Sequence, residues 1–212
     1  MVVSYSKTLE DLLLKVKKVQ ESYRKNMQNN IENILKSNPL IPVVTIENLD
    51  QIESIYKKLV SQNVKCIEIT LRTEVAWNAI SIFQTKYGSE FKIGVGTVVS
   101  VEDIIKCEKL DVDFIVSPGY SASMLKQYKK SKLPFLPGVS TPGEIIQGIE
   151  DGCQFFKLFP ANLFGGIDAL KTYNNIFPNV KFCPTGGINE NNHHSFLALN
   201  NVISVGGSWL IK

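Results

Sequence analysis

The run Phe155-Phe156-Lys157-Leu158-Phe159-Pro160 places a single lysine among aromatic and aliphatic side chains. A short continuous apolar run of this kind is typical of a strand that is buried on both faces. A charged ammonium is costly there, so burial should favour the neutral amine, which is a nucleophile toward carbonyl carbon. The same run also fits an edge strand whose lysine extends its stem to water. Taken alone, it leaves both interpretations open.

Similar apolar or β-branched runs recur on both sides of this stretch, and segments of helical periodicity separate them. The expected strands are residues 41–46, 66–71, 92–97, 114–118, 134–139, 155–160, 180–185 and 202–206. The expected helices between them lie near residues 49–62, 74–86, 101–109, 121–131, 141–151, 166–174 and 190–200. Eight tandem βα units favour an α/β fold of the closed (β/α)₈ TIM-barrel type over an open doubly wound sheet. We expect one domain overall, with a helical extension (1–38) packed on a barrel (39–212).

Composition is ordinary for a soluble globular protein, with 44% hydrophobic and 20% charged residues among 212. A net charge of +3 is too small to indicate a nucleic-acid partner. The four cysteines form no C-x-x-C pair, so we expect reduced thiols in an intracellular protein. The sequence contains neither a signal peptide nor a run of membrane-spanning length, so a cytoplasmic location is expected.

Polar residues at the carboxyl ends of the expected strands are the candidates for chemistry, because barrels of this type react substrates there. Strand alternation places Glu68, Thr70 and Arg72 on the inward face, and the same alternation turns Lys157 inward. Glu68 and Arg72 are consistent with a buried ion pair in a polar barrel core. They are equally consistent with a carboxylate for proton transfer and a guanidinium that binds a substrate carboxylate.

Glycines follow the last two expected strands, as Gly186-Gly187 and as Gly206-Gly207-Ser208. Small residues allow backbone N–H groups to approach an anion, and phosphate sites in these barrels often form from these two loops. Turns also require glycine for purely conformational reasons. His193-His194 lie on a polar helix face, where we expect them to be solvated, and no metal site is expected.

Seven segments, in order along residues 41–212, resemble those of the bacterial 2-keto-3-deoxy-6-phosphogluconate aldolases, which often also act as 4-hydroxy-2-oxoglutarate aldolases. The segments are Ile67–Thr73, Gly94–Val98, Ser117–Gly119, Pro137–Thr141, Phe156–Ala161, Phe182–Ile188 and Gly206–Leu210. The resemblance implies a carbon–carbon lyase with class I aldol chemistry, no metal and no cofactor. It also implies a small keto-acid phosphosugar as substrate and a homotrimer, with no nucleic acid or membrane as partner.

The resemblance also implies roles for individual residues. Lys157 would form the Schiff base with the substrate keto carbon, and Glu68 would accept and donate the proton. The implied substrate-binding residues are Arg72, Thr97, Pro118, Phe159, Thr185, Gly186, Gly187, Gly206 and Ser208. Two alternatives stay open: an aldolase for the galactonate epimer, and a non-catalytic barrel that binds phosphate.

The sequence departs from the family pattern at both ends. Family members normally continue into an eighth helix, whereas this sequence ends at Lys212, and residues 7–36 are expected to be helical. We hypothesise that residues 7–22 take the place of the missing or relocated eighth helix, because the apolar stripe Leu9–Val19 needs a surface to cover. The plainer alternative is a natural tail together with a truncated end.

Overall fold

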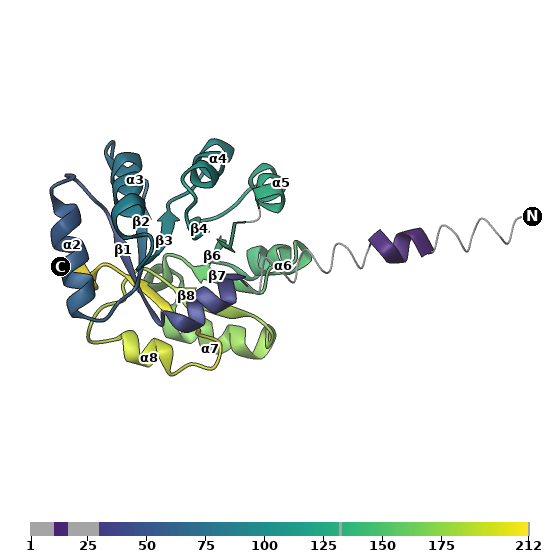
Figure 1. Cartoon of the computed structure of the whole chain (residues 1–212). Helices are drawn as coiled ribbons and strands as arrows, with labels where there is room; N and C mark the ends of the chain where they lie inside the picture. Colours follow the sequence, from purple (N-terminus) through teal and green to yellow (C-terminus); the bar gives the residue numbers. More distant parts are fainter. Residues whose placement is uncertain (1–10, 17–29, 132, 212) are drawn as a thin grey trace, which may run out of the picture.

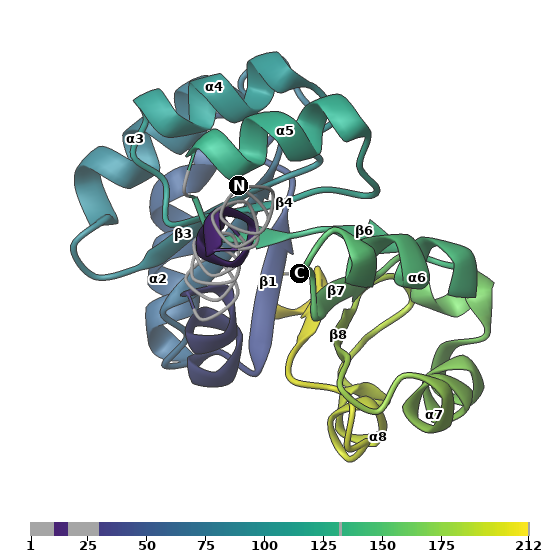
Figure 2. The same ribbon diagram turned by 90° about the vertical axis from the view of Figure 1, so that its right-hand side faces the viewer.

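Parallel strands form a curled sheet at the centre of the fold (Figures 1 and 2). The computed structural model describes residues 11–16, 30–131 and 133–211. The strands are β1 (Leu40–Val44), β2 (Cys66–Thr70), β3 (Lys92–Gly96), β4 (Phe114–Val116), β5 (Phe135–Leu136), β6 (Gly138–Val139), β7 (Phe155–Leu158), β8 (Lys181–Pro184) and β9 (Val205–Gly207). They pair in the order β5-β4-β3-β2-β1-β9, with a second run β6-β7-β8.

Two connections close this sheet into a barrel. The isolated parallel bridges Phe182–Val202 and Thr185–Gly206 join β8 to the last strand region. On the other side, the fifth expected strand is divided into β5 and β6 at Pro137, because proline has no N–H to donate to a ladder. The Pro137 carbonyl still accepts a hydrogen bond from the Lys157 N–H at 2.8 Å. The predicted (β/α)₈ TIM-barrel fold is therefore confirmed, with one interrupted strand.

Helices surround the barrel, one after almost every strand (Figure 2). They are α2 (Gln51–Ser61), α3 (Ala76–Tyr87), α4 (Val101–Lys109), α5 (Ala122–Ser131), α6 (Pro142–Glu150), α7 (Gly166–Ile176) and α8 (His193–Leu197), with the short 3₁₀ helices η1 (Ala161–Phe164) and η2 (Trp209–Ile211). The apolar faces of α2 and α3 pack on the outward side chains of β2 and β3, including Ile67 and Ile93. None of the helices in the described part of the chain is long and apolar enough to span a membrane.

Helix α8 is much shorter than the helix expected over residues 190–200. The Asn192 side chain accepts a hydrogen bond from the Asn189 N–H at 2.8 Å, and the Asn189 side chain accepts one from the Asn191 N–H at 2.9 Å. Such local side-chain bonds offer the backbone an alternative to the helix, so this asparagine-rich segment forms a turn before α8 begins.

The amino-terminal end of the barrel is sealed by the helix formed by residues 30–37. Ile31 and Leu35 of this helix are completely buried. They pack with Ile41, Phe114 and Phe155, which point inward at the amino ends of their strands. This helix therefore completes an apolar core on the side of the barrel opposite to the expected site.

Residues 11–16 are helical, and they bear on the hypothesis that residues 7–22 replace an eighth helix. Leu12, Leu13 and Val16 are 60%, 55% and 47% exposed, so this part does not cover β1 and β9, and the hypothesis is wrong for it. Residues 7–10 and 17–22 lie outside the described residues. Beside α2 the structure instead has η2, where the Gln62 side chain donates to the Leu210 carbonyl at 3.1 Å.

Candidate active site

A lysine and a carboxylate meet inside the barrel, from strands on opposite sides of it. Lys157 on β7 lies with its Nζ atom 3.0 Å from Oε1 of Glu68 on β2, and the two side chains are 3% and 4% exposed. Strand β7 pairs with β6 on one side and with β8 on the other, so the edge-strand interpretation of Lys157 is wrong. The expectation that both side chains share one interior is confirmed. Removing either partner would leave an uncompensated buried charge.

A glycine and a phenylalanine shape the space around this pair. Gly96 on β3 lies next to Glu68, and a Cβ atom at position 96 would overlap the Glu68 carboxylate. The Phe159 ring lies with its centroid 5.1 Å from Nζ of Lys157, within the range of a cation–π interaction. The carboxylate therefore has room only because β3 carries no side chain there, and the amine faces an aromatic ring.

A neutral thiol lies beside Lys157 on the adjacent strand. Cys183 on β8 is the register partner of Lys157 and is 2% exposed. Burial raises the pKa of the Cys183 thiol to about 11, while a hydrogen bond with Ser204 and the charge of Lys157 act in the opposite direction. At neutral pH the thiol is therefore uncharged. The thiol therefore adds no further charge to the interior that holds Lys157 and Glu68.

Arg72 lies two residues after the end of β2 and is held by the loop after β3. Its Nε atom donates to Oγ1 of Thr97 at 3.1 Å. Thr97 has a φ of +61°, a left-handed conformation that is rare for a β-branched residue. Residues held in such strained conformations cluster at functional sites. Arg72 makes no other hydrogen bond or ion pair with the described residues, so its remaining N–H groups are available to a ligand.

A pocket of about 390 Å³ lies at the carboxyl ends of the strands. Its lining includes six of the predicted substrate-binding residues, namely Arg72, Phe159, Thr185, Gly186, Gly187 and Ser208. Two others lie behind the lining: Thr97 holds Arg72, and a Cβ atom at Gly206 would overlap the Thr185 hydroxyl. Pro118 is not part of the lining, and its carbonyl lies against Gly138 instead. The structure therefore gathers most of the predicted set around one cavity.

The end of β8 supplies groups that suit a polar ligand. Thr185 is 5% exposed, and its Oγ1 atom has no oxygen or nitrogen partner among the described residues; the neighbouring Cys183 thiol is only a weak partner. Gly186 and Gly187 have φ angles of +103° and +74°, which side chains other than glycine rarely adopt. The Gly186 carbonyl accepts a hydrogen bond from the Asn162 N–H at 3.2 Å, which ties this loop to η1.

Sequence reasoning missed one inward residue of β1 and the residue that follows this strand. Val43 and Thr45 both line the pocket, and Thr45 lies with its Oγ1 atom 2.9 Å from Oγ1 of Thr70. The signal was present, because strand alternation from Ile41 turns positions 43 and 45 to the inside. A threonine in a strand is so common that its type alone did not single it out.

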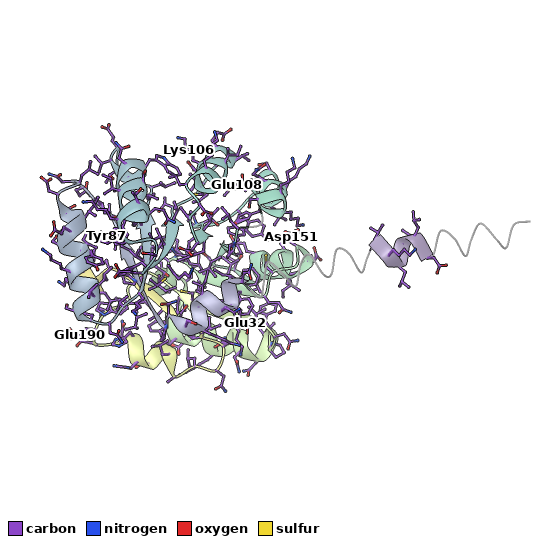
Figure 3. All side chains as sticks on the ribbon, viewed as in Figure 1. Glu32, Tyr87, Lys106, Glu108, Asp151 and Glu190 are labelled. Atoms are coloured by element: carbon purple, nitrogen blue, oxygen red, sulfur yellow. The ribbon has the colours of Figure 1, made fainter. Side chains whose placement is uncertain are left out.

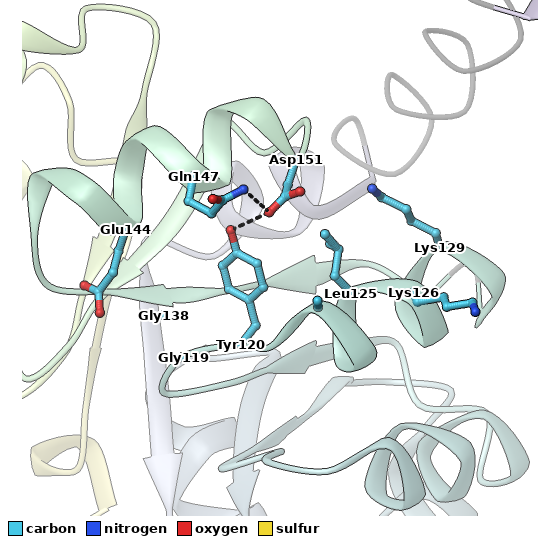
Figure 4. A pocket seen from close by; sticks show the side chains of 10 residues that line it. Gly119, Tyr120, Leu125, Lys126, Lys129, Gly138, Glu144, Gln147 and Asp151 are labelled. Carbon is cyan, nitrogen blue, oxygen red and sulfur yellow. Dashed lines mark hydrogen bonds between the residues drawn. The ribbon is translucent and has the colours of Figure 1, made fainter.

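A second cavity, of about 570 Å³, lies outside the barrel between α5 and α6 (Figure 4). Three of its polar side chains pair with one another: the Tyr120 hydroxyl and the Gln147 amide both donate to Oδ2 of Asp151, at 3.1 and 3.3 Å. None of the predicted site residues lines it. It is larger than the pocket in the barrel. Lys157 and Glu68 line neither cavity, but the barrel pocket is lined by Phe159, whose ring lies 5.1 Å from Nζ of Lys157.

The histidine pair differs from expectation. His193 is buried, and its ring lies 5.5 Å from that of Trp209, because the short α8 turns this position toward β9, whereas His194 is exposed. Nδ1 of His193 lies 2.9 Å from the Glu190 carbonyl. Within residues 11–16, 30–131 and 133–211, no three histidine, cysteine, aspartate or glutamate residues come together in a way that could hold a metal ion.

A buried amine beside a single carboxylate can attack a ketone and then exchange protons with the bound intermediate. In a (β/α)₈ barrel, with the pair beneath a pocket at the carboxyl ends of the strands, this is the arrangement of a class I, or Schiff-base, aldolase. The model of the family described as "KDPG and KHG aldolase" matches residues 31–212. The chain belongs to this family.

Individual relatives agree with this membership. The KHG/KDPG aldolase of Escherichia coli (strain K12) is 37% identical over 187 residues, which cover 88% of this chain and 87% of that protein. The 2-dehydro-3-deoxy-phosphogluconate aldolase of Dickeya dadantii (strain 3937) has the same identity and coverage. The crystal structure of the KDPG aldolase of Legionella pneumophila, with pyruvate captured as a covalent carbinolamine intermediate, superposes with a TM-score of 0.81 at 37% identity. That match covers 84% of this chain and 86% of the other.

Proposed function

We propose that this chain is a class I aldolase that cleaves 2-keto-3-deoxy-6-phosphogluconate to pyruvate and glyceraldehyde 3-phosphate. The observation that carries the proposal is the buried contact of 3.0 Å between Nζ of Lys157 and Oε1 of Glu68. Membership in the KDPG and KHG aldolase family supports the same substrate class. The names of the relatives from Escherichia coli and Dickeya dadantii point to this substrate as well.

The first half of the reaction forms the imine. Glu68 takes a proton from the Lys157 ammonium, and the neutral amine attacks the keto carbon C2 of the substrate. The resulting carbinolamine loses water, with Glu68 supplying the proton to the departing hydroxyl. The product is a protonated imine between Nζ and C2, which attracts electrons from the neighbouring carbon–carbon bond.

The second half breaks the C3–C4 bond. Glu68, now a carboxylate, removes the proton from the C4 hydroxyl, and the C3–C4 electron pair moves toward the imine nitrogen to form an enamine. C4 leaves as the aldehyde carbon of glyceraldehyde 3-phosphate. Glu68 then returns its proton to C3, and water hydrolyses the imine to free pyruvate and Lys157. Proton transfer by a positioned carboxylate contributes about 10²–10⁴-fold to such rates.

The two ends of the substrate need separate recognition. In our proposal Arg72 and Thr97 bind the C1 carboxylate, since the guanidinium keeps unused N–H groups that face no other described partner. Backbone N–H groups of Gly186, Gly187 and Gly206 bind the phosphate together with the Ser208 hydroxyl. Thr185 and Phe159 complete the set of contacts to the carbon chain.

Cleavage of 4-hydroxy-2-oxoglutarate to pyruvate and glyoxylate is a second activity that we propose for the same pair. It uses the same bond changes between C2 and C4, and the Escherichia coli relative is named for both substrates. The galactonate-series alternative is less well supported, because the structure described as native KDPGal is 21% identical and establishes the common fold alone. A non-catalytic barrel would have no reason to keep a buried lysine beside a carboxylate.

The test is covalent trapping. The protein is incubated with pyruvate and borohydride, and the modified peptide is mapped by mass spectrometry. We expect a reduced adduct on Lys157, and its absence from that residue would contradict the proposal. A Lys181→Ala variant is the matched control, because Lys181 lies on the adjacent strand β8 but its amine binds the Asn200 carbonyl at the surface. This variant should form the adduct normally.

We further propose a homotrimer in the cytoplasm. None of the four cysteines, all within the described part of the chain, forms a disulfide, and all four are buried, as reduced thiols in a cell interior would be. Sedimentation equilibrium measures the mass of the assembly directly, and a species other than three chains would contradict the trimer.

A further inference from the structure

Thr45 occupies a particular place around the pocket. It follows β1 directly, and β1 lies between β2, which leads to Arg72, and β9, which leads to Ser208. The side chains of all three residues line the same cavity. In the proposed function Arg72 binds the carboxylate end of the substrate and Ser208 the phosphate end. Thr45 therefore faces the part of the carbon chain that lies between the two ends.

The hydrogen bonds around Thr45 determine what its hydroxyl can do for a ligand. The Thr70 hydroxyl donates to the Val44 carbonyl at 3.2 Å, which uses its single hydrogen. Oγ1 of Thr45 lies 2.9 Å from Oγ1 of Thr70, and either hydroxyl could donate in that contact; both this bond and the Thr70–Val44 bond are made only when Thr45 is the donor. The Thr45 hydroxyl makes no other hydrogen bond with the described residues. In the arrangement that makes both hydrogen bonds, it offers the pocket lone pairs but no hydrogen, so it is an acceptor there.

We propose that Thr45 is a specificity-determining residue, whose hydroxyl accepts a hydrogen bond from the C5 hydroxyl of the substrate. This inference rests on the proposed function and deepens it. The C4 hydroxyl must lie near Glu68 to lose its proton, so the next hydroxyl along the chain is the one left for Thr45. It favours keto acids that carry a hydroxyl between the bond that breaks and the phosphate.

The short substrate provides the contrast. In 4-hydroxy-2-oxoglutarate the carbon after C4 is a carboxylate, which can accept hydrogen bonds but has none to donate. Two acceptors that face each other gain nothing. Thr45 should thus contribute to cleavage of the phosphorylated hydroxy acid and contribute nothing to cleavage of the short dicarboxylate.

The experiment compares two substitutions on two substrates. Thr45→Val keeps the shape of the side chain and removes the hydroxyl, whereas Thr45→Ser keeps the hydroxyl. We expect Thr45→Val to lower kcat/KM on 2-keto-3-deoxy-6-phosphogluconate by about three- to tenfold, the effect of one neutral hydrogen bond. The same variant should leave kcat/KM on 4-hydroxy-2-oxoglutarate unchanged or raised. Thr45→Ser should restore cleavage of the phosphorylated substrate.

An analogue without the C5 hydroxyl tests the atom itself, because wild type and Thr45→Val should cleave it equally well. An equal loss on both natural substrates would overturn the proposal, since it would mean that Thr45 acts through Thr70 and the packing of β2. No loss on either would overturn it as well. Trapping with pyruvate and borohydride separates the two claims: wild type without an adduct contradicts the aldolase itself, whereas normal trapping in every variant confines a failure to Thr45.

Discussion

The two ends of the barrel interior are built from the same strands and have opposite character. At the amino end Phe114 and Phe155 pack with Ile31 and Leu35 in a dry apolar core. At the carboxyl end the interior holds the Lys157–Glu68 pair. Strand β7 contributes to both, with Phe155 at the lower level and Lys157 two residues higher. Alternation along a strand thus decides which residues face inward, and height along the barrel axis decides whether they stabilise or react.

The largest effect is expected from Lys157→Met, which keeps most of the side-chain volume and removes the amine. Loss of the nucleophile should lower kcat/KM by about 10⁴–10⁶-fold, the order seen when a covalent catalyst loses its attacking group. Lys92→Met is the control, because the Lys92–Asp113 pair at the amino end is formed by a lysine that is 56% exposed. That variant should retain activity and lose less than about 1 kcal/mol of stability. Steady-state kinetics and urea denaturation give both quantities.

Glu68→Gln should have the next largest effect. The amide keeps the shape of the carboxyl group but cannot take a proton from the C4 hydroxyl, so kcat should fall by about 10²–10⁴-fold. Single-turnover kinetics separates imine formation from cleavage of the C3–C4 bond. Cleavage should be slow in this variant, although the variant is folded. If Glu68→Gln cleaved the substrate at the wild-type rate, another group would have to accept the proton, and Glu68 would not be the general base.

Leu35→Ala should destabilise the apolar core at the amino end of the barrel and leave catalysis at the carboxyl end unchanged. Leu35 is completely buried beneath the barrel, so its truncation leaves a cavity and should cost about 2–5 kcal/mol of unfolding free energy. The kcat measured at a temperature where the variant is folded should equal that of wild type. Lys36→Ala is the matched control on the same helix, because Lys36 is 63% exposed. A large fall in kcat for Leu35→Ala would show that the two ends are coupled.

Gly96→Ala should disturb the upper end without changing any polar group. The added methyl group would overlap the Glu68 carboxylate and displace it from Lys157. A displacement of roughly 1 Å can cost about 10²-fold in rate, so we expect a loss of that order in kcat/KM. Gly143→Ala on α6 meets nothing within 4 Å and serves as the control. Equal behaviour of the two variants would mean that the Glu68 position is not critical.

Glu144→Gln should give the smallest change in stability. Glu144 lies in the first turn of α6 and holds the loop before this helix, at the carboxyl end of the barrel. The Glu144 side chain accepts hydrogen bonds from the Ser140 and Thr141 N–H groups at 2.7 and 2.8 Å. Partial burial would raise the pKa of Glu144, but these bonds outweigh burial and lower it. A lowered pKa stabilises the fold above the pKa of the unfolded chain, and this contribution disappears as pH falls through the folded pKa.

The variant should therefore lose about 0.3–1 kcal/mol at neutral pH, because glutamine can still accept these hydrogen bonds but lacks the negative charge that favours a helix N-terminus. The difference in Tm between wild type and variant should shrink toward zero in acid. A difference that stayed constant with pH would show that ionisation of Glu144 is not the cause.

Much of this division could be predicted from the pattern of residues. Alternation in residues 66–72 and 155–160 correctly predicted that Glu68 and Lys157 point into the same barrel interior. The interruption at Pro137 was not foreseen, because the run around it is apolar and reads as one strand. The left-handed φ of Thr97 cannot be inferred from a residue type that usually avoids it. His193 was expected in solvent but is buried. The start of α8 depends on local asparagine hydrogen bonds, which the helical periodicity did not indicate.

The helix of residues 30–37 has a consequence for how the protein is made. It is translated before every strand of the barrel, yet its buried partners include Phe155 on β7 and Cys183 on β8, which are translated much later. During synthesis the apolar side chains of Ile31 and Leu35 therefore stay uncovered until β7 and β8 have been made. Contacts between such distant parts of a chain slow folding and prolong the exposure of sticky surfaces. Nascent chains that stall before β8 should therefore be the forms that chaperones bind most strongly.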